Sequence, residues 1–160
     1  MRMLNSSYFY SSISLIAALI LQIIPITGSI VYWRPQFLLL VVFYWLFYRQ
    51  SKYGVGFAWL TGLILDMFAG EMLGRYALTF SLCAYFLIVL SKRLQHFGIF
   101  HQAALIFFMV LLNQLLVASI SLLYRADWSV IFLLGPALTS ALIWPLLALL
   151  MNKFFSKYKD

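Results

Sequence analysis

The sequence predicts an all-α polytopic membrane protein with about six transmembrane helices in one bundle. Of its 160 residues, 65% are hydrophobic and only 9% are charged, and the mean hydropathy is +0.99. A soluble domain is roughly half apolar and a quarter charged, so this chain has more apolar surface than a water-soluble fold can bury. The apolar residues also fall into separate runs, and a helix needs roughly 20 mostly apolar residues to cross a bilayer. We therefore expect a single integral membrane domain over residues 1–160.

Charged residues and helix breakers divide the apolar runs into six predicted spans. They lie at approximately residues 11–28, 35–50, 53–69, 76–92, 102–124 and 129–151. No A-x-A cleavage site follows the first span, so it is expected to stay as an uncleaved anchor. The second span is the weakest, because the segment from Pro35 to Tyr48 would rise only about 21 Å as a helix. Five full spans and one re-entrant segment are therefore the alternative topology.

The basic residues predict the orientation of these spans. Those expected on the inner side are Arg2, Arg49, Lys52, Lys92, Arg93, Lys153, Lys157 and Lys159, against Arg34, Arg75 and Arg125 on the outer side. The positive-inside rule then places both termini in the cytoplasm. This asymmetry explains the net charge of +7, and the short juxtamembrane clusters give no case for nucleic-acid binding.

One face of the third span carries small residues and an acid. Gly54, Ala58, Gly62 and Asp66 recur at every fourth position, which places them on one narrow stripe of a helix. Small residues at this spacing let helix backbones approach closely in lipid. The stripe therefore predicts tight helix packing, with Asp66 facing protein.

Asp66 has more than one candidate role. A carboxylate at the centre of a span costs about 2.5–3.5 kcal/mol, so partner contact and ion-coupled transport are alternatives that stay open. The favoured role is structural. Gly70, Glu71 and Gly74 are expected to form the outer turn into the fourth span, and Asp66 would accept hydrogen bonds from nearby backbone N–H groups.

No group of residues predicts catalysis, a metal site or a cofactor site. His96 and His101 fall on the inner side, away from the acids near the outer face. The single cysteine, Cys83, excludes an internal disulfide framework. Asn113 and Gln114 lie inside the fifth span, where amides usually form interhelical hydrogen bonds. We therefore expect a protein that is not an enzyme, with no catalytic, metal or cofactor residues.

Four segments resemble the MreD family of rod shape-determining membrane proteins. They are LQIIP (Leu21–Pro25), WRPQFLLLVVFYW (Trp33–Trp45), the glycine-rich run Gly54–Gly74 and IWP (Ile143–Pro145). The resemblance covers nearly the whole chain, in order. Trp59 and Thr61 depart from the pattern, because they stand where smaller residues are expected, although the stripe itself is kept.

The resemblance implies a place in the bacterial inner (cytoplasmic) membrane, within the cell-elongation machinery. The expected partners are MreC, the actin-like MreB filament, the RodA glycosyltransferase, its penicillin-binding transpeptidase and membrane lipid. It also implies a fold similar to the substrate-binding subunits of energy-coupling-factor vitamin transporters, a likeness that does not by itself confer transport.

The function that follows is a non-catalytic scaffold linking MreC, MreB and the peptidoglycan synthases. Its candidate partner contacts are Arg34, Pro35, Asp66 and Arg75. The alternative is a small-molecule-binding membrane subunit of a vitamin-type transporter, with a cavity lined by Asp66, Asn113 and Gln114.

Overall fold

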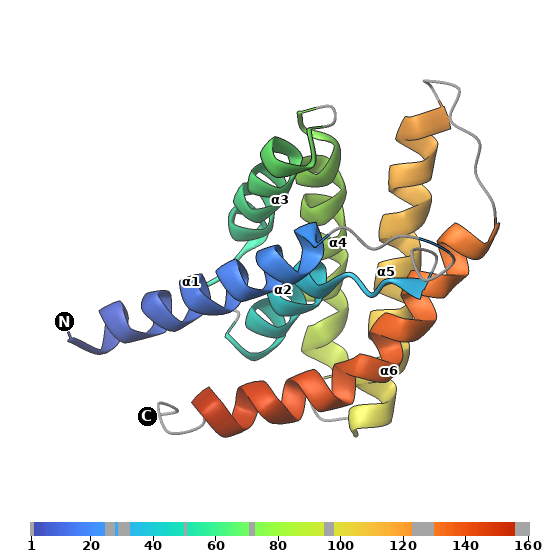
Figure 1. The fold of residues 1–160 in the computed structure, drawn as a ribbon. Helices are drawn as coiled ribbons and strands as arrows, with labels where there is room; N and C mark the ends of the chain where they lie inside the picture. Colours follow the sequence, from blue (N-terminus) through green and yellow to red (C-terminus); the bar gives the residue numbers. More distant parts are fainter. Residues whose placement is uncertain are drawn as a thin grey trace.

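A computed structural model of the chain describes residues 2–24, 28, 33–49, 51–70, 73–94, 98–122 and 130–155. These residues form helices and no strand, which confirms the predicted all-α class for this part of the chain (Figure 1). The helices are α1 (Arg2–Ile23), α2 (Phe37–Tyr48), α3 (Val55–Ala69), α4 (Arg75–Leu94), α5 (Ile99–Leu122) and α6 (Val130–Phe155).

Two of these helices are long and apolar enough, by length and composition, to cross a membrane. The qualifying segments are Ile99–Ile120 in α5 and Leu133–Phe154 in α6. The remaining described helices contain shorter apolar segments, namely Phe9–Ile23, Phe37–Tyr48, Val55–Ala69 and Arg75–Ser91. Six complete spans therefore stay a prediction.

The helix bounds differ from the predicted spans mainly at the ends. α1 begins at Arg2, well before residue 11, and α6 continues to Phe155, past residue 151. α2 begins at Phe37, so Pro35 lies just before the helix. Apolar periodicity marks the part of a helix that contacts core or lipid, whereas polar residues at either end extend a helix without leaving this signal.

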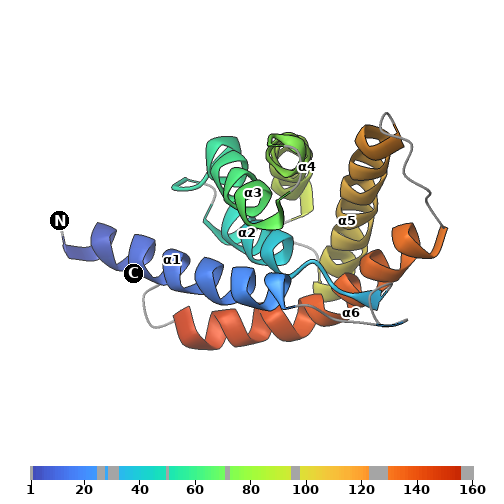
Figure 2. The same cartoon turned by 45° about the horizontal axis from the view of Figure 1, so that its top comes forward.

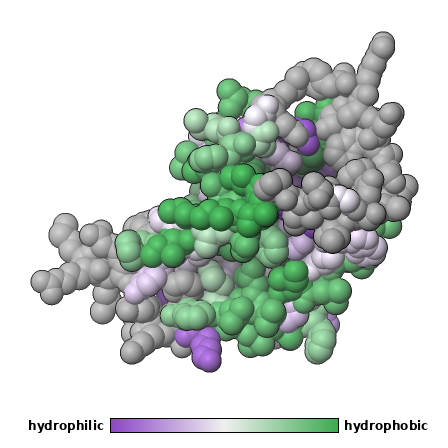
Figure 3. All heavy atoms as spheres, viewed as in Figure 1, coloured by the Kyte–Doolittle hydropathy of each residue, from purple (hydrophilic) through white to green (hydrophobic). Residues whose placement is uncertain are grey.

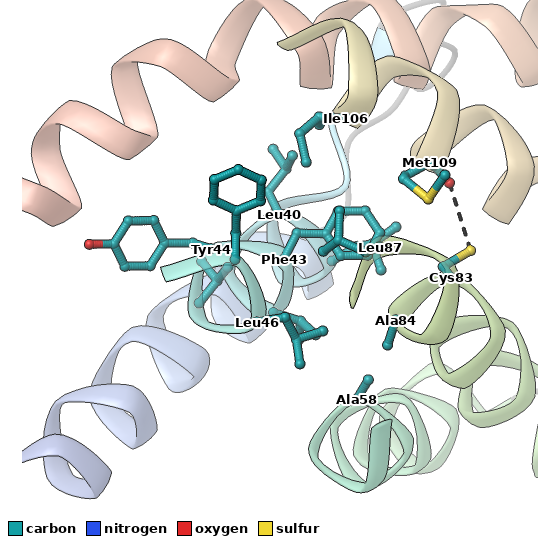
Figure 4. Close-up of a cluster of buried hydrophobic side chains, with 14 of the residues drawn as sticks. Leu40, Phe43, Tyr44, Leu46, Ala58, Cys83, Ala84, Leu87, Ile106 and Met109 are labelled. Atoms are coloured by element: carbon teal, nitrogen blue, oxygen red, sulfur yellow. Dashed lines mark hydrogen bonds between the residues drawn. The ribbon is translucent and has the colours of Figure 1, made fainter. Parts of the chain in front are cut away.

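The central helix, α2, is buried on all sides. Every residue from Leu38 to Phe47 is buried, as expected for a helix that is apolar around its whole circumference. It packs against α1, α3, α4 and α6. Figure 4 shows its side chains surrounded by residues of the neighbouring helices, including Leu87 of α4 and Ile106 of α5.

Hydrogen bonds from side chains hold the C-terminal end of α2 to three other helices. Tyr44 Oη donates to Asn152 Oδ1 of α6 at 2.9 Å. Trp45 Nε1 donates to Ser14 Oγ of α1 at 3.0 Å, and Tyr48 Oη donates to the side-chain oxygen of Gln102 in α5 at 3.2 Å. Because each bond joins a different helix, the end of α2 is fixed in position as well as in rotation.

The other helices form neighbouring pairs around α2. α3 packs most extensively against α4, α5 against α6, and α4 also contacts α5. The buried Cys83 of α4 points its thiol at the Met109 carbonyl of α5, at 3.7 Å (Figure 4). In Figures 1 and 2, α1 runs across the direction of α3 and α4, and its N-terminal end lies on the same side as the C-terminal end of α6.

Large apolar side chains cover much of the outside of the described helices (Figure 3). On α6, exposed leucines recur at every fourth position, at Leu134, Leu138, Leu142 and Leu146. This spacing places them on one helix face. An apolar outer surface of this kind suits a protein whose surroundings are lipid.

We predict that Leu40→Ala, in the centre of α2, lowers the free energy of unfolding by about 2–5 kcal/mol, because it leaves a cavity in a fully packed core. The matched control is Leu142→Ala, since Leu142 is 78% exposed while Leu40 is 0% exposed. Denaturant unfolding in mixed micelles measures both. Equal losses from the two variants would show that α2 is not the packed centre.

Candidate functional site

The connection between α3 and α4 contains two glycines in the left-handed backbone region. Gly70 is the C-cap of α3 with φ of 64°, and Gly74, just before α4, has φ of 99°. L-residues with a side chain are strained in this region, which makes glycine the usual C-cap. These glycines turn the chain back so that α4 begins beside the last turns of α3. Glu71, predicted in the same turn, lies outside the described residues.

Asp66 of α3 uses its carboxylate to cap the first turn of α4. Its Oδ2 accepts hydrogen bonds from the backbone N–H of Gly74 at 3.0 Å and of Ala77 at 3.1 Å. Its Oδ1 accepts from the N–H of Tyr76 at 2.9 Å. An ordinary N-cap residue binds the second and third helical N–H groups from within its own helix; here the cap comes from the preceding helix.

This arrangement provides the partners that a buried carboxylate requires. Asp66 is only 1% exposed, and an ionised group buried without partners would be strongly destabilising. The N-terminus of a helix carries unpaired N–H groups and a partial positive charge. Three such N–H groups are the hydrogen-bond partners of this carboxylate, and the carboxylate in turn holds α4 against α3.

Gly62 lies one helical turn before Asp66 and allows the backbones of α3 and α4 to approach each other closely. A Cβ built at Gly62 would lie 2.5 Å from the carbonyl oxygen of Tyr76 and 2.7 Å from Cα of Ala77. These are backbone atoms of the same turn of α4 that Asp66 caps. Any side chain at residue 62 would push that turn away from the carboxylate.

The other members of the predicted stripe do not all share this contact. Ala58 is completely buried, and in Figure 4 it faces Ala84 of α4. Gly54 is exposed, precedes the first residue of α3, and has nothing within 4 Å of an added Cβ. The close helix contact is therefore made by Ala58, Gly62 and Asp66, and it does not reach Gly54.

A second junction forms around the segment from Arg34 to Gln36, which precedes α2. The guanidinium of Arg34 donates to the backbone carbonyl of Leu21 at 2.7 Å and to that of Gln22. These carbonyls belong to the last turn of α1, whose C-terminal end carries a partial negative charge. Partial burial lowers the pKa of Arg34 from its usual value, but an arginine stays protonated in proteins.

Gln36 continues this junction to α5 and α6. Its backbone N–H donates to Ser140 Oγ at 3.1 Å, and its side-chain oxygen accepts from Asn113 Nδ2 at 2.8 Å. Asn113 thus forms a hydrogen bond outside its own helix, as expected, although its partner is the N-cap residue of α2 and not a residue within a helix. Pro35 lies between the two contacting residues, and its fixed φ limits the conformations that this short segment can adopt.

Arg75, the first residue of α4, lies beside the Asp66 cap. Its guanidinium carbon is 5.2 Å from the centroid of the Tyr76 ring, within the range of a cation–π contact. Arg75 thus lies at the start of α4, next to the α3–α4 contact, whereas Arg34 and Pro35 belong to the junction before α2. The four candidate partner contacts therefore lie in two different places.

The sequence did not point to Gln36, Ser140, Tyr44 or Asn152 as structural residues. Gln36 and Asn152 are polar residues near the edge of an apolar run, whereas Tyr44 and Ser140 lie inside one and carry no such signal. Among the described residues, no cluster of three or more His, Cys, Asp or Glu side chains is placed to hold a metal ion.

Comparisons with known proteins agree over the length of the chain. A family model described as rod shape-determining protein MreD matches residues 1–155. A curated protein, the rod shape-determining protein MreD of Haemophilus influenzae (strain ATCC 51907 / DSM 11121 / KW20 / Rd), is 30% identical over 145 residues, covering 90% of this chain and 89% of its own length. No solved structure matches, so the similarity to vitamin-transporter subunits has no support from these comparisons.

We predict that Gly62→Ala destabilises the protein by about 1–3 kcal/mol, because the new methyl group overlaps backbone atoms that must move as a unit. Gly56→Ala is the matched control on the same helix, since an added Cβ at residue 56 meets nothing within 4 Å. Gly56→Ala should be neutral or stabilising, because alanine is the better helix former. Thermal unfolding in detergent compares the two, and a neutral Gly62→Ala would contradict the close contact.

We also predict that Asp66→Asn speeds hydrogen exchange at the amides of Gly74, Tyr76 and Ala77. Asparagine keeps one acceptor oxygen but loses the charge, and a hydrogen bond to a charged group contributes about 1.5–3 kcal/mol. Exchange measured by mass spectrometry or NMR should rise at the start of α4, while the amides in the middle of α5 serve as the internal control. Unchanged protection at these three amides would exclude the cap.

Proposed function

Because the chain belongs to the MreD family of rod shape-determining proteins, we propose that it acts as a non-catalytic membrane scaffold of the cell-elongation machinery. In this proposal it links MreC, the MreB filament, RodA and the elongation transpeptidase. The family places the protein in the rod-shape system; the scaffold role and the individual partners are our inference.

The observation that carries the proposal is that both carboxylate oxygens of Asp66 already have hydrogen-bond partners within the protein. It is the only acid among the residues whose side chains the structure describes, and both of its oxygens accept backbone hydrogen bonds from α4. A transport or catalytic carboxylate has to exchange a proton or contact a substrate. A carboxylate with three backbone donors instead favours a fixed bundle.

The competing proposal, a vitamin-type binding subunit, requires one cavity lined by Asp66, Asn113 and Gln114. Asp66 is bound to the start of α4, while Asn113 is bound to Gln36. A groove lies between α1, α2 and α3, and its lining includes none of these residues. Purification followed by mass spectrometry tests the competing proposal, because a copurifying water-soluble small molecule that is lost in Asp66→Asn would favour it.

The distribution of charge supports the proposed orientation, with both termini in the cytoplasm. Arg49 and Lys52 follow α2, and Lys153 lies in the last turn of α6. Arg34 precedes α2 and Arg75 is the first residue of α4, so both lie at the N-terminal ends of these helices. The larger share of the described cations thus falls where the positive-inside rule expects the cytoplasm.

We predict that Gly62→Leu abolishes rod shape in cells that depend on this protein, because the side chain separates α3 from α4 and disturbs the surface offered to MreC. Gly56→Leu is the matched control, since residue 56 is exposed and has open space around it. Cell shape is scored by microscopy, and the amount of protein in the membrane by immunoblot. Rod-shaped cells with normal levels of the Gly62→Leu protein would contradict the scaffold mechanism.

The partner face itself is mapped by crosslinking from single cysteines in a Cys83→Ala background. Exposed positions on α3, α4 and α6 are the informative sites. Crosslinks to MreC confined to one helix face would identify the docking surface, and uniform or absent crosslinks would contradict direct binding.

A further inference from the structure

An apolar groove lies between α1, α2 and α3. It is an open groove, whose volume of about 290 Å³ includes the space at its mouth, and it is lined by Leu15, Ile16, Leu19, Leu38, Thr61 and Ile64. Thr61 is the one polar residue of this lining, and its hydroxyl is turned back to its own helix, donating to the carbonyls of Phe57 at 3.1 Å and Ala58 at 2.9 Å. The groove therefore presents only apolar surface to an occupant.

The groove opens outward. Ile16 of α1 is 57% exposed and Ile64 of α3 is 44% exposed, so the lining residues of both outer helices reach the molecular surface. Figures 1 and 2 show α1 passing next to α2 and α3, and α1 contacts both helices. In a membrane protein, an apolar groove that opens sideways faces the acyl chains of the bilayer.

One end of the groove adjoins the positively charged junction before α2. Leu19 is three positions before Gln22, so the two side chains lie on the same face of α1, about 4.5 Å apart along its axis. Arg34 donates to the Gln22 carbonyl, and Leu38 belongs to the first turn of α2, immediately after the same junction. The guanidinium of Arg34 thus lies close to one end of the apolar groove.

Some buried polar atoms at this junction have no hydrogen-bond partner among the described residues. Nε of Arg34 and the side-chain oxygen of Gln22 are buried without a partner among the described residues. Asn113, bonded to Gln36 in the same junction, is completely buried, and its Oδ1 also has no partner in the described part of the chain. Such groups are costly unless a ligand or water satisfies them.

The positive charge of Arg34 has no negatively charged partner among the residues whose side chains are described. Asp66 is the only acid whose side chain is described, and it is bound to the start of α4. Arg34 has backbone carbonyls as its partners, which do not neutralise a full charge. A phosphate oxygen is a strong acceptor for a guanidinium.

We propose that this groove is a lipid site: it holds one acyl chain of an anionic glycerophospholipid whose phosphate lies against Arg34. The apolar lining selects a hydrocarbon chain, and the arginine selects an anionic headgroup. The bound lipid fills the space between α1 and the two helices behind it, and so stabilises the attachment of α1.

Native mass spectrometry of the purified full chain tests the proposal, with phosphatidylglycerol and phosphatidylcholine as the probes. The wild-type protein should retain one phosphatidylglycerol, in preference to phosphatidylcholine. Arg34→Gln should weaken phosphatidylglycerol binding about tenfold or more and remove the preference, because one charge-assisted contact is lost. Ile64→Trp should fill the groove and reduce retention of both lipids.

Two controls match these variants. Lys153→Gln removes one positive charge from the last turn of α6, and Leu142→Trp adds a large side chain at a residue that is 78% exposed. Neither residue lines the groove, so both controls should bind lipid like the wild type. Circular dichroism verifies folding; because Arg34 also contacts the end of α1, Ile64→Trp carries the test alone if Arg34→Gln fails to fold.

Several results would overturn the proposal. Lipid retention by Ile64→Trp equal to that of Leu142→Trp would show that the chain is not in the groove. A preference for phosphatidylglycerol that survives Arg34→Gln would remove the arginine from the site. Displacement of the lipid by millimolar free glycerol phosphate would indicate a site for a soluble phosphate. Loss of MreC crosslinks in Ile64→Trp with unchanged lipid binding would assign the groove to a protein helix. Since lipid binding is measured without partners, its failure would leave the scaffold proposal untouched.

Discussion

The structure depends on the burial of α2 on every side. With 12 residues, this helix is about 18 Å long, much shorter than the roughly 30 Å hydrocarbon core of a bilayer. The polar side chains near both ends of so short and enclosed a helix lie among neighbouring helices, where they need hydrogen-bond partners. The hydrogen bonds of Gln36 at one end and of Tyr44, Trp45 and Tyr48 at the other follow from this need.

The same requirement explains the two charged junctions. Asp66 lies at the N-terminus of α4 and Arg34 at the C-terminus of α1, so each charge meets the helix end of opposite sign. Neither residue is paired with the other, and each connects two helices through backbone groups. A backbone partner is not removed when a side chain elsewhere is substituted, so these hydrogen bonds depend only on Asp66 and Arg34 themselves and on the local backbone. The Asp66 contact further requires Gly62, since the carboxylate reaches α4 only when no side chain separates the two backbones.

The parts of this architecture that depend on local residue spacing could be predicted from the sequence. Composition predicts the all-α class, and the four-residue spacing places Gly62 and Asp66 on one face of α3. It also included Gly54, which the structure leaves exposed, because a spacing pattern does not register that the helix begins only at Val55. The junction around Gln36 could not be predicted from the sequence, because its partners Asn113 and Ser140 are 77 and 104 positions away along the chain. Nothing in a local pattern selects one distant amide or hydroxyl over another.

The use of polar groups inside the bundle has a consequence for where recognition takes place. Asp66, the amides of Gln36 and Asn113 and the hydroxyls of Tyr44 and Tyr48 hold one part of the bundle to another, while most of the described Ser and Thr hydroxyls bond to carbonyls of their own helix. These groups are therefore committed before any partner arrives. The surfaces still available are the apolar outer faces, where α3 presents Met67 and Phe68, α4 presents Tyr85 and Phe86, and α6 presents its row of leucines. These faces are offered in a fixed relation to one another because α2 and the two charged junctions hold the helices that carry them. On the two proposals above, a partner span or a lipid would be selected by its fit to these apolar ridges and grooves, with Arg34 providing a positive charge near the groove between α1, α2 and α3.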